Sequence, residues 1–97
     1  MSNPDSGVFG IAWYRPEQWS LMLSLIPDPE VFPKTHEEWL AKAMKLEREL
    51  TQKGITAVRI EVELKALLDW AAKEKRPADS AARSAYALLL TQAGLYR

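Results

Sequence analysis

The chain has 97 residues, of which 47% are hydrophobic and 27% are charged, and this length and composition are typical of one small globular domain. Thirteen basic and thirteen acidic side chains cancel to a formal net charge of zero, so no overall field attracts nucleic acid or an anionic membrane. The absence of cysteine excludes disulfides, thiolate metal sites and cysteine nucleophiles. No apolar run approaches the roughly 20 residues that span a bilayer, and we expect a cytoplasmic protein with no membrane partner.

The first part of the chain predicts a tail, a strand and a short helix. Residues 1–7 are polar and turn-rich, and we expect a flexible N-terminal tail there, followed by one domain over residues 8–97. Val8 to Tyr14 is apolar throughout and rich in β-branched and aromatic residues, which predicts a strand at the centre of the fold. Pro16 suits the first position of a helix that is predicted to run to Ile26. A hairpin is the alternative, because the apolar residues of this segment also alternate.

The middle of the chain predicts a proline loop followed by a capped helix. Three prolines cannot continue a helix, so Pro27 to Lys34 is predicted to be a loop in which Asp28 is solvated. The segment Thr35-His36-Glu37-Glu38 is a capping box: the Thr35 hydroxyl can accept from the Glu38 amide, while the Glu38 carboxylate reaches back to the Thr35 amide. A long helix is predicted to follow and to end at Gly54 in the left-handed conformation.

The remaining chain predicts one strand and two helices. Apolar and charged residues alternate from Val58 to Glu63, as in a strand with one covered face. Leucines at helical spacing from Leu64 predict a third helix that ends before Pro77, and Asp79 is predicted to cap a fourth that stops at Gly94. The fold class is therefore α+β, a small single domain with two short strands and about four helices in the order β-α-α-β-α-α. If each element turns back on the one before, the two strands are antiparallel.

Three sequence motifs occur in order: AWYRPEQW from Ala12, THEEW from Thr35 and LLDW from Leu67. In these motifs the chain resembles a family of small uncharacterised bacterial proteins, over most of its length from about Ile11 onward. The resemblance implies a bacterial origin and supports the helix that begins at Pro16. It implies no activity, cofactor or catalytic residue.

Two groups of polar residues are candidates for catalysis. His36 is the only histidine, and a neutral imidazole beside glutamates could act as a general base, although we interpret it as a solvated residue of the first helical turn. Glu61 and Glu63 lie about 7 Å apart on one face of the predicted strand, a separation that a catalytic carboxylate pair could use. We interpret them as the solvated face of a sheet. A single histidine offers no usual zinc ligand set, so no metal and no cofactor are expected.

Aromatic and basic residues are candidates for binding. The four tryptophans are expected in the core, and a pocket or partner groove is the alternative. The candidate binding residues are Trp13, Tyr14, Arg15, Gln18, Trp19 and His36. A basic cluster could contact phosphate, but we interpret it as a solvated helix end. Its members are Lys73, Lys75, Arg76 and Arg83.

We expect a non-catalytic protein-interaction or regulatory module whose partner is another protein or a second copy of this chain. One alternative is a small-ligand binder or enzyme with a site near Arg15, Glu17 and His36, and another is a weak nucleic-acid accessory protein. A homodimer is expected because the apolar arc of the last helix is wider than one core face needs. This arc assigns Tyr86 and Leu90 to an interface.

Overall fold

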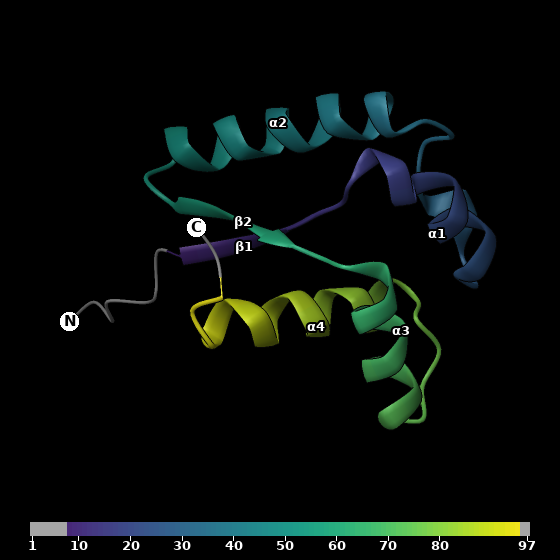
Figure 1. The fold of residues 1–97 in the computed structure, drawn as a ribbon. Coiled ribbons are helices and arrows are strands. Elements are labelled where there is room, and N and C mark those ends of the chain that lie inside the picture. The colour runs from purple at the N-terminus through teal and green to yellow at the C-terminus, as the bar shows by residue number, and fades with distance from the viewer. Residues whose placement is uncertain (1–7, 96–97) are drawn as a thin grey trace.

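Two helices cover the two faces of a small parallel sheet (Figure 1). The computed structural model describes residues 8–95, in which the sheet consists of β1 (Val8–Trp13) and β2 (Thr56–Glu61). The helix α2 (His36–Gln52) lies on one face and α4 (Ser80–Gln92) lies on the other. The α+β class and the order β-α-α-β-α-α predicted from the sequence are therefore confirmed. The predicted N-terminal tail falls outside the described residues.

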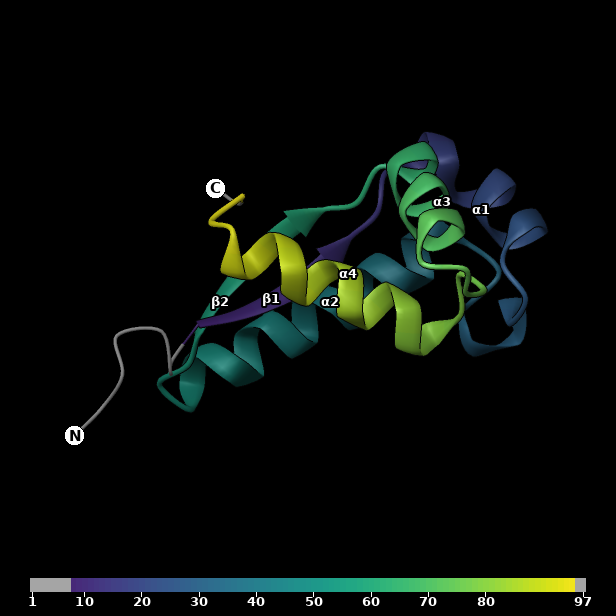
Figure 2. The same ribbon diagram turned by 90° about the horizontal axis from the view of Figure 1, so that it is seen from below.

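The two strands are parallel, which corrects the antiparallel arrangement expected from the sequence. They pair in register from Val8 with Thr56 to Trp13 with Glu61. The expectation assumed that both intervening helices run along the sheet, but the first, α1 (Trp19–Leu25), has only seven residues and lies beyond the end of the strands (Figures 1 and 2). Only α2, with 17 residues, returns the chain along the sheet. One returning helix between two strands is a β-α-β crossover, which makes the strands parallel.

The segment after β1 is helical, so the helix prediction is confirmed against the alternative hairpin. A short 3-10 turn, η1 (Pro16–Gln18), leads into α1, and Pro16 occupies its first position, where its missing N–H costs nothing. The helix ends at Leu25, and the backbone of Ile26 is extended because Pro27 follows it. The proline loop that comes next contains one further 3-10 turn, η2 (Pro29–Val31).

Capping side chains set the starts of the two long helices. Thr35 Oγ1 accepts from the Glu38 amide at 3.2 Å, and Asp79 Oδ1 accepts from the Ala82 amide at 2.9 Å, as predicted. The second half of the capping box differs, because the Glu38 carboxylate accepts from the Thr35 hydroxyl, at 3.0 Å, instead of from the Thr35 amide. Gly54 follows α2 with a φ of 80°, the left-handed conformation expected of it.

The helix α3 (Leu64–Lys73) lies at the same end of the sheet as α1 and contacts α4 (Figure 2). Its Trp70 ring packs on the Tyr86 ring of α4, with 5.3 Å between ring centroids. Because β2 ends at Glu61, Glu63 lies outside the strand and precedes α3. The carboxylate pair expected on one strand face is therefore not formed as predicted.

The core lies between the helices and the sheet. Ile60, Val62 and Leu67 are its largest fully buried side chains. Trp19 and Trp39 are buried and the other two tryptophans are partly buried against the same cluster, which confirms the core placement expected from the sequence. In residues 8–95 no helix combines the length and the apolar character that crossing a membrane requires.

Candidate functional site: a groove along the open edge of β1

The strand β1 has an open edge. It pairs with β2 on one side, and no strand in the described part of the chain lies on its other side. The Trp13 carbonyl accepts from the Val62 amide at 2.9 Å, so the main-chain groups of the odd-numbered residues of β1 point towards β2. Main-chain groups alternate between the two sides of a strand. Those of Val8, Gly10 and Ala12 therefore point to the open edge.

A groove of about 530 Å³ runs along this edge. Its base is formed by β1 and its walls by α2 and α4, which lie behind and in front of β1 in Figure 2. Residues of the loop around η2 also line it. Four of the lining side chains are large, apolar and exposed: Phe9 (48%), Val31 (55%), Leu46 (39%) and Leu88 (56%). Exposed apolar side chains gathered in one concave site are typical of a binding surface.

Both faces of β1 are covered, although its edge is open. On one face the Trp13 ring meets the Trp39 ring of α2, with 5.4 Å between centroids. On the other face α4 approaches so closely that a Cβ atom on Gly10 would overlap Thr91 Oγ1 and lie 2.9 Å from Ile60 Cγ1. Glycine at this position therefore allows the close packing of α4 on the sheet.

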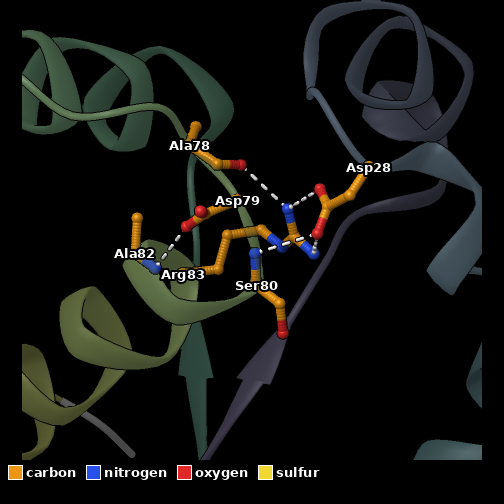
Figure 3. A network of polar contacts seen from close by, with 6 residues as sticks. All are labelled: Asp28, Ala78, Asp79, Ser80, Ala82 and Arg83. Carbon is orange, nitrogen blue, oxygen red and sulfur yellow. Dashed lines mark hydrogen bonds and ion pairs between the residues drawn. The ribbon is translucent and has the colours of Figure 1, made fainter.

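Among the described residues that line the groove, Arg83 alone is charged, and an ion pair neutralises it (Figure 3). Its guanidinium donates to both carboxylate oxygens of Asp28, at 2.7 and 3.1 Å, and also to the Ala78 carbonyl at 2.8 Å. The Ser80 amide donates to the same carboxylate at 3.0 Å. The side chain of Arg83 is only 5% exposed and that of Asp28 is 17% exposed. The hydrogen bonds from Arg83 hold the pKa of the Asp28 carboxyl below its usual value, against the effect of burial.

This pair corrects two expectations. Asp28 was predicted to be a solvated turn residue and Arg83 to belong to a basic cluster at a solvated helix end, but the two are joined across 55 residues of sequence. A bidentate guanidinium–carboxylate pair can be buried because each charge satisfies the other. It fixes the proline loop to the first turns of α4.

Tyr14 lies where the groove meets this ion pair. It is 7% exposed and lines the groove, and its ring packs edge-on against Trp19, Phe32 and Trp39. Burial raises the pKa of the Tyr14 hydroxyl to about 12, although the neighbouring Arg83 charge acts in the opposite direction. This phenol therefore stays neutral near neutral pH and cannot serve as a base there.

His36 closes one end of the open edge. Its Nε2 lies 2.7 Å from the carbonyl oxygen of Tyr14, the next main-chain group after Ala12 on that side of the chain. As the carbonyl can only accept, Nε2 carries the proton in this contact. The imidazole also packs against the Trp19 and Trp39 rings, at 5.6 and 5.1 Å between centroids. His36 lies in the first turn of α2, as predicted, but it is partly buried and not fully solvated, because its ring contacts the Tyr14 carbonyl, just after β1, and two tryptophan rings.

The other predicted binding residues do not converge on one pocket. Arg15 pairs with Glu61 at 2.6 Å on the surface. The Gln18 side chain accepts from the Leu64 amide at 3.0 Å, at the start of α3. Trp19 Nε1 donates to the Lys34 carbonyl at 3.2 Å. These contacts hold the turns around the end of the sheet together, and of the six candidate residues only Tyr14 lines the groove.

The predicted interface residues also lie elsewhere than expected. Tyr86 and Leu90 are partly buried and pack against the core, and the Tyr86 ring also meets the Trp70 ring of α3. The exposed leucines of α4 are Leu88 and Leu89, at 56% and 47%. Leu88 lines the groove and Leu89 does not.

The outer edge of β2 differs from that of β1. By the same alternation, its outward main-chain groups belong to residues such as Arg59 and Glu61. Arg59 forms a two-point ion pair with Glu47 of α2, at 2.8 and 2.9 Å, and stacks on the Trp13 ring. Charged side chains protect an edge from pairing with another strand. The residues of β1 are all uncharged, so its edge has no such protection.

No protein-family model, curated protein or solved structure matches this chain. The resemblance to a family of small bacterial proteins therefore stays a prediction. In residues 8–95 no three His, Asp or Glu side chains come close enough together to hold a metal ion.

Sequence reasoning identified Tyr14 but missed the groove. The apolar run of β1 is typical of a strand whose two faces are covered, and it does not indicate whether the edge of the strand is paired. β1 lies between α2 and α4, at the centre of the fold as predicted, but the sequence did not indicate that one of its edges is unpaired in the described chain.

Proposed function

We propose that this protein is a non-catalytic interaction module that binds a segment of another polypeptide in the groove along β1. The observation that carries the proposal is the edge of β1 that pairs with no strand of the described residues and lies at the base of an apolar groove. β1 is apolar on both faces, and a helix covers each face. Its outer edge is uncharged and pairs with no strand of the described residues. Such an edge is a ready template for pairing with another chain. The setting predicted from the sequence, the cytoplasm of a bacterial cell, is part of this proposal.

The charges around the groove favour a polypeptide over the alternative partners. Nucleic acid is bound by cationic side chains, and within residues 8–95 the one cation that lines the groove is already paired with Asp28. An enzyme or small-ligand site near Arg15, Glu17 and His36 would need these groups to converge on one cavity. None of the three lines the groove, and the His36 ring is held by the Tyr14 carbonyl. A mostly apolar groove with a main-chain edge at its base suits an apolar segment of polypeptide.

Selection of peptides on the purified protein tests this function. We would pass a phage-displayed library of random 12-residue peptides over the immobilised chain and measure the binding of enriched peptides by fluorescence anisotropy. Leu46→Glu places a charge in the groove, whereas Met44→Glu makes the same change on the same helix outside it. Both side chains are 39% exposed, which makes the variants a matched pair.

We expect enriched peptides whose affinity falls at least about tenfold in Leu46→Glu and stays unchanged in Met44→Glu. Failure to enrich any peptide, or equal affinity for both variants, would contradict the proposed function.

A further inference from the structure

We propose that the occupant of the groove adds a third strand to the sheet beside β1, and that this strand is uncharged and apolar on both of its faces. The inference rests on the proposed function and specifies the chemistry of the partner. Three observations carry it: the main-chain groups at the open edge, the position of His36, and the two walls of the groove.

The open edge offers main-chain hydrogen bonds. The main-chain groups of Trp13 point towards β2, and main-chain groups alternate in direction along the strand. Val8, Gly10 and Ala12 therefore each direct an N–H and a carbonyl towards the groove. An alternating row of donors and acceptors matches the backbone of an extended peptide. Main-chain bonds of this kind supply affinity for almost any sequence, so the walls of the groove must supply selectivity.

His36 sets the length of the added strand. The next carbonyl on the open side after Ala12 is that of Tyr14, which already accepts from the imidazole at 2.7 Å. Strand pairing therefore extends from Val8 to Ala12 and ends there. This span corresponds to an added segment of about five residues, roughly 17 Å long.

The walls decide the side chains of the added strand. Residues of both α2 and α4 line the groove that begins at the β1 edge, so the two helices extend past β1 on its open side. A strand in this position is covered on both faces, and strands buried in this way are apolar on both faces. Leu46 on one wall and Leu88 on the other contribute apolar surface. The described lining residues offer no unpaired charge to a charged partner residue, because Arg83 is paired with Asp28.

The same walls favour a free segment over a second copy of β1. In a second copy, β1 carries its own α2 on one face and its own α4 on the other. Those helices would need the space that the walls of the first copy occupy. An extended segment without helices packed on its faces has no such conflict.

The test uses a peptide enriched on the protein and two N-methylated versions of it. Methylation removes amide donors at alternate residues, so one version loses the donors that face β1 and the other loses only donors that face away. We expect one version to bind at least about tenfold more weakly and the other to bind within about threefold of the parent. Equal effects of the two versions would overturn strand addition while leaving the interaction function intact.

Hydrogen exchange of the ¹⁵N-labelled protein gives a second measurement that needs no variant. In the free protein we expect the Gly10 and Ala12 amides to exchange quickly and the Ile11 amide, which faces β2, to exchange slowly. The parent peptide should slow exchange at Gly10 and Ala12 and leave Arg59 on the outer edge of β2 unchanged. Binding without this protection would overturn the inference. The same experiment on a chain lacking residues 2–7 checks that those residues do not occupy the edge. If the Gly10 and Ala12 amides exchanged quickly only after residues 2–7 were removed, the inference would also be overturned.

Occupation by a second copy is a separate outcome. Light scattering would then show a dimer that Leu88→Asp converts to a monomer and Leu89→Asp does not, and this result would overturn the inference in favour of self-pairing. We expect Leu88→Asp to leave the state of association unchanged.

Discussion

The Arg83 guanidinium and the Asp28 carboxylate form a buried two-point ion pair that joins the proline loop to the start of α4. A second pair of the same kind, Arg59 with Glu47, lies at the surface between β2 and α2. Both pairs are bidentate. Arg83 uses Nη1 and Nη2 and Arg59 uses Nε and Nη2, and the Asp28–Arg83 pair is the more buried of the two, so their contributions to stability can be compared within one small protein.

Removing the buried carboxylate should destabilise the fold far more than removing the exposed one. Asp28→Ala leaves the Arg83 charge buried without its partner, and we expect a loss of about 3 kcal/mol in the free energy of unfolding. Glu47→Ala breaks the surface pair and should cost less than about 1 kcal/mol. Urea unfolding followed by tryptophan fluorescence measures both. Equal losses would show that the Asp28–Arg83 pair is not buried in solution.

The same carboxylate should make stability depend on pH. Hydrogen bonds from Arg83 hold the pKa of Asp28 in the folded protein below its usual value of 3.8. The unfolded chain therefore binds this proton more readily, so the stabilisation is complete above the unfolded pKa and is lost as pH falls through the lower folded pKa. We expect the difference in unfolding free energy between the natural chain and Asp28→Asn to be constant from pH 7 to about 5 and to shrink below about 3.8. A difference that persists to about pH 2 would contradict this assignment.

The cap of α2 should contribute measurably to stability. Thr35→Ala removes the oxygen that accepts from the Glu38 amide, and such a loss costs about 1 kcal/mol. Thr51→Ala is the matched control, because the Thr51 hydroxyl only donates to the Glu47 carbonyl within the same helix. Its free energy of unfolding should stay within about 0.5 kcal/mol of the natural chain. An unchanged urea midpoint in Thr35→Ala would place the start of α2 elsewhere.

Gly10 should not tolerate a side chain. Gly10→Ala places a Cβ atom against Thr91 Oγ1 and Ile60 Cγ1, and overpacking of this kind typically costs about 1–3 kcal/mol. Thr91→Ala removes the closest of these atoms, so the double variant should recover part of the loss. Thermal unfolding of the two single variants and the double variant measures the coupling. Strictly additive effects would contradict the close approach of α4 to β1.

Self-association remains a prediction, but its location changes. Leu90 packs against the core, so Leu90→Glu would test folding more than association. Leu89 and Leu95 are exposed apolar residues at 47% and 63%, outside the groove, and could form a two-fold contact. Light scattering at high micromolar concentration should give twice the monomer mass of 11.0 kDa, and Leu89→Glu should restore the monomer. A natural chain that stays monomeric would exclude this contact.

The sequence by itself determined the features that depend on neighbouring residues. Thr35 and Asp79 start their helices, and Gly54 and Gly94 follow helix ends with positive φ, because caps and left-handed turns are settled within about four residues of chain. The proline loop ended α1 for the same local reason. The apolar segment from Val8 to Tyr14 also correctly predicted a strand.

Only the tertiary structure decided which distant residues meet. The direction of β2 depended on how far each intervening helix runs along the sheet, which periodicity does not determine. The pairing of Asp28 with Arg83 and the contact of His36 with the Tyr14 carbonyl join residues 55 and 22 positions apart. The sequence around a single polar residue does not identify its distant partner. Whether such a residue is buried therefore depends on how the helices and strands pack. The open edge of β1 arises in the same way, because a strand's own sequence does not specify how many neighbours the folded chain provides.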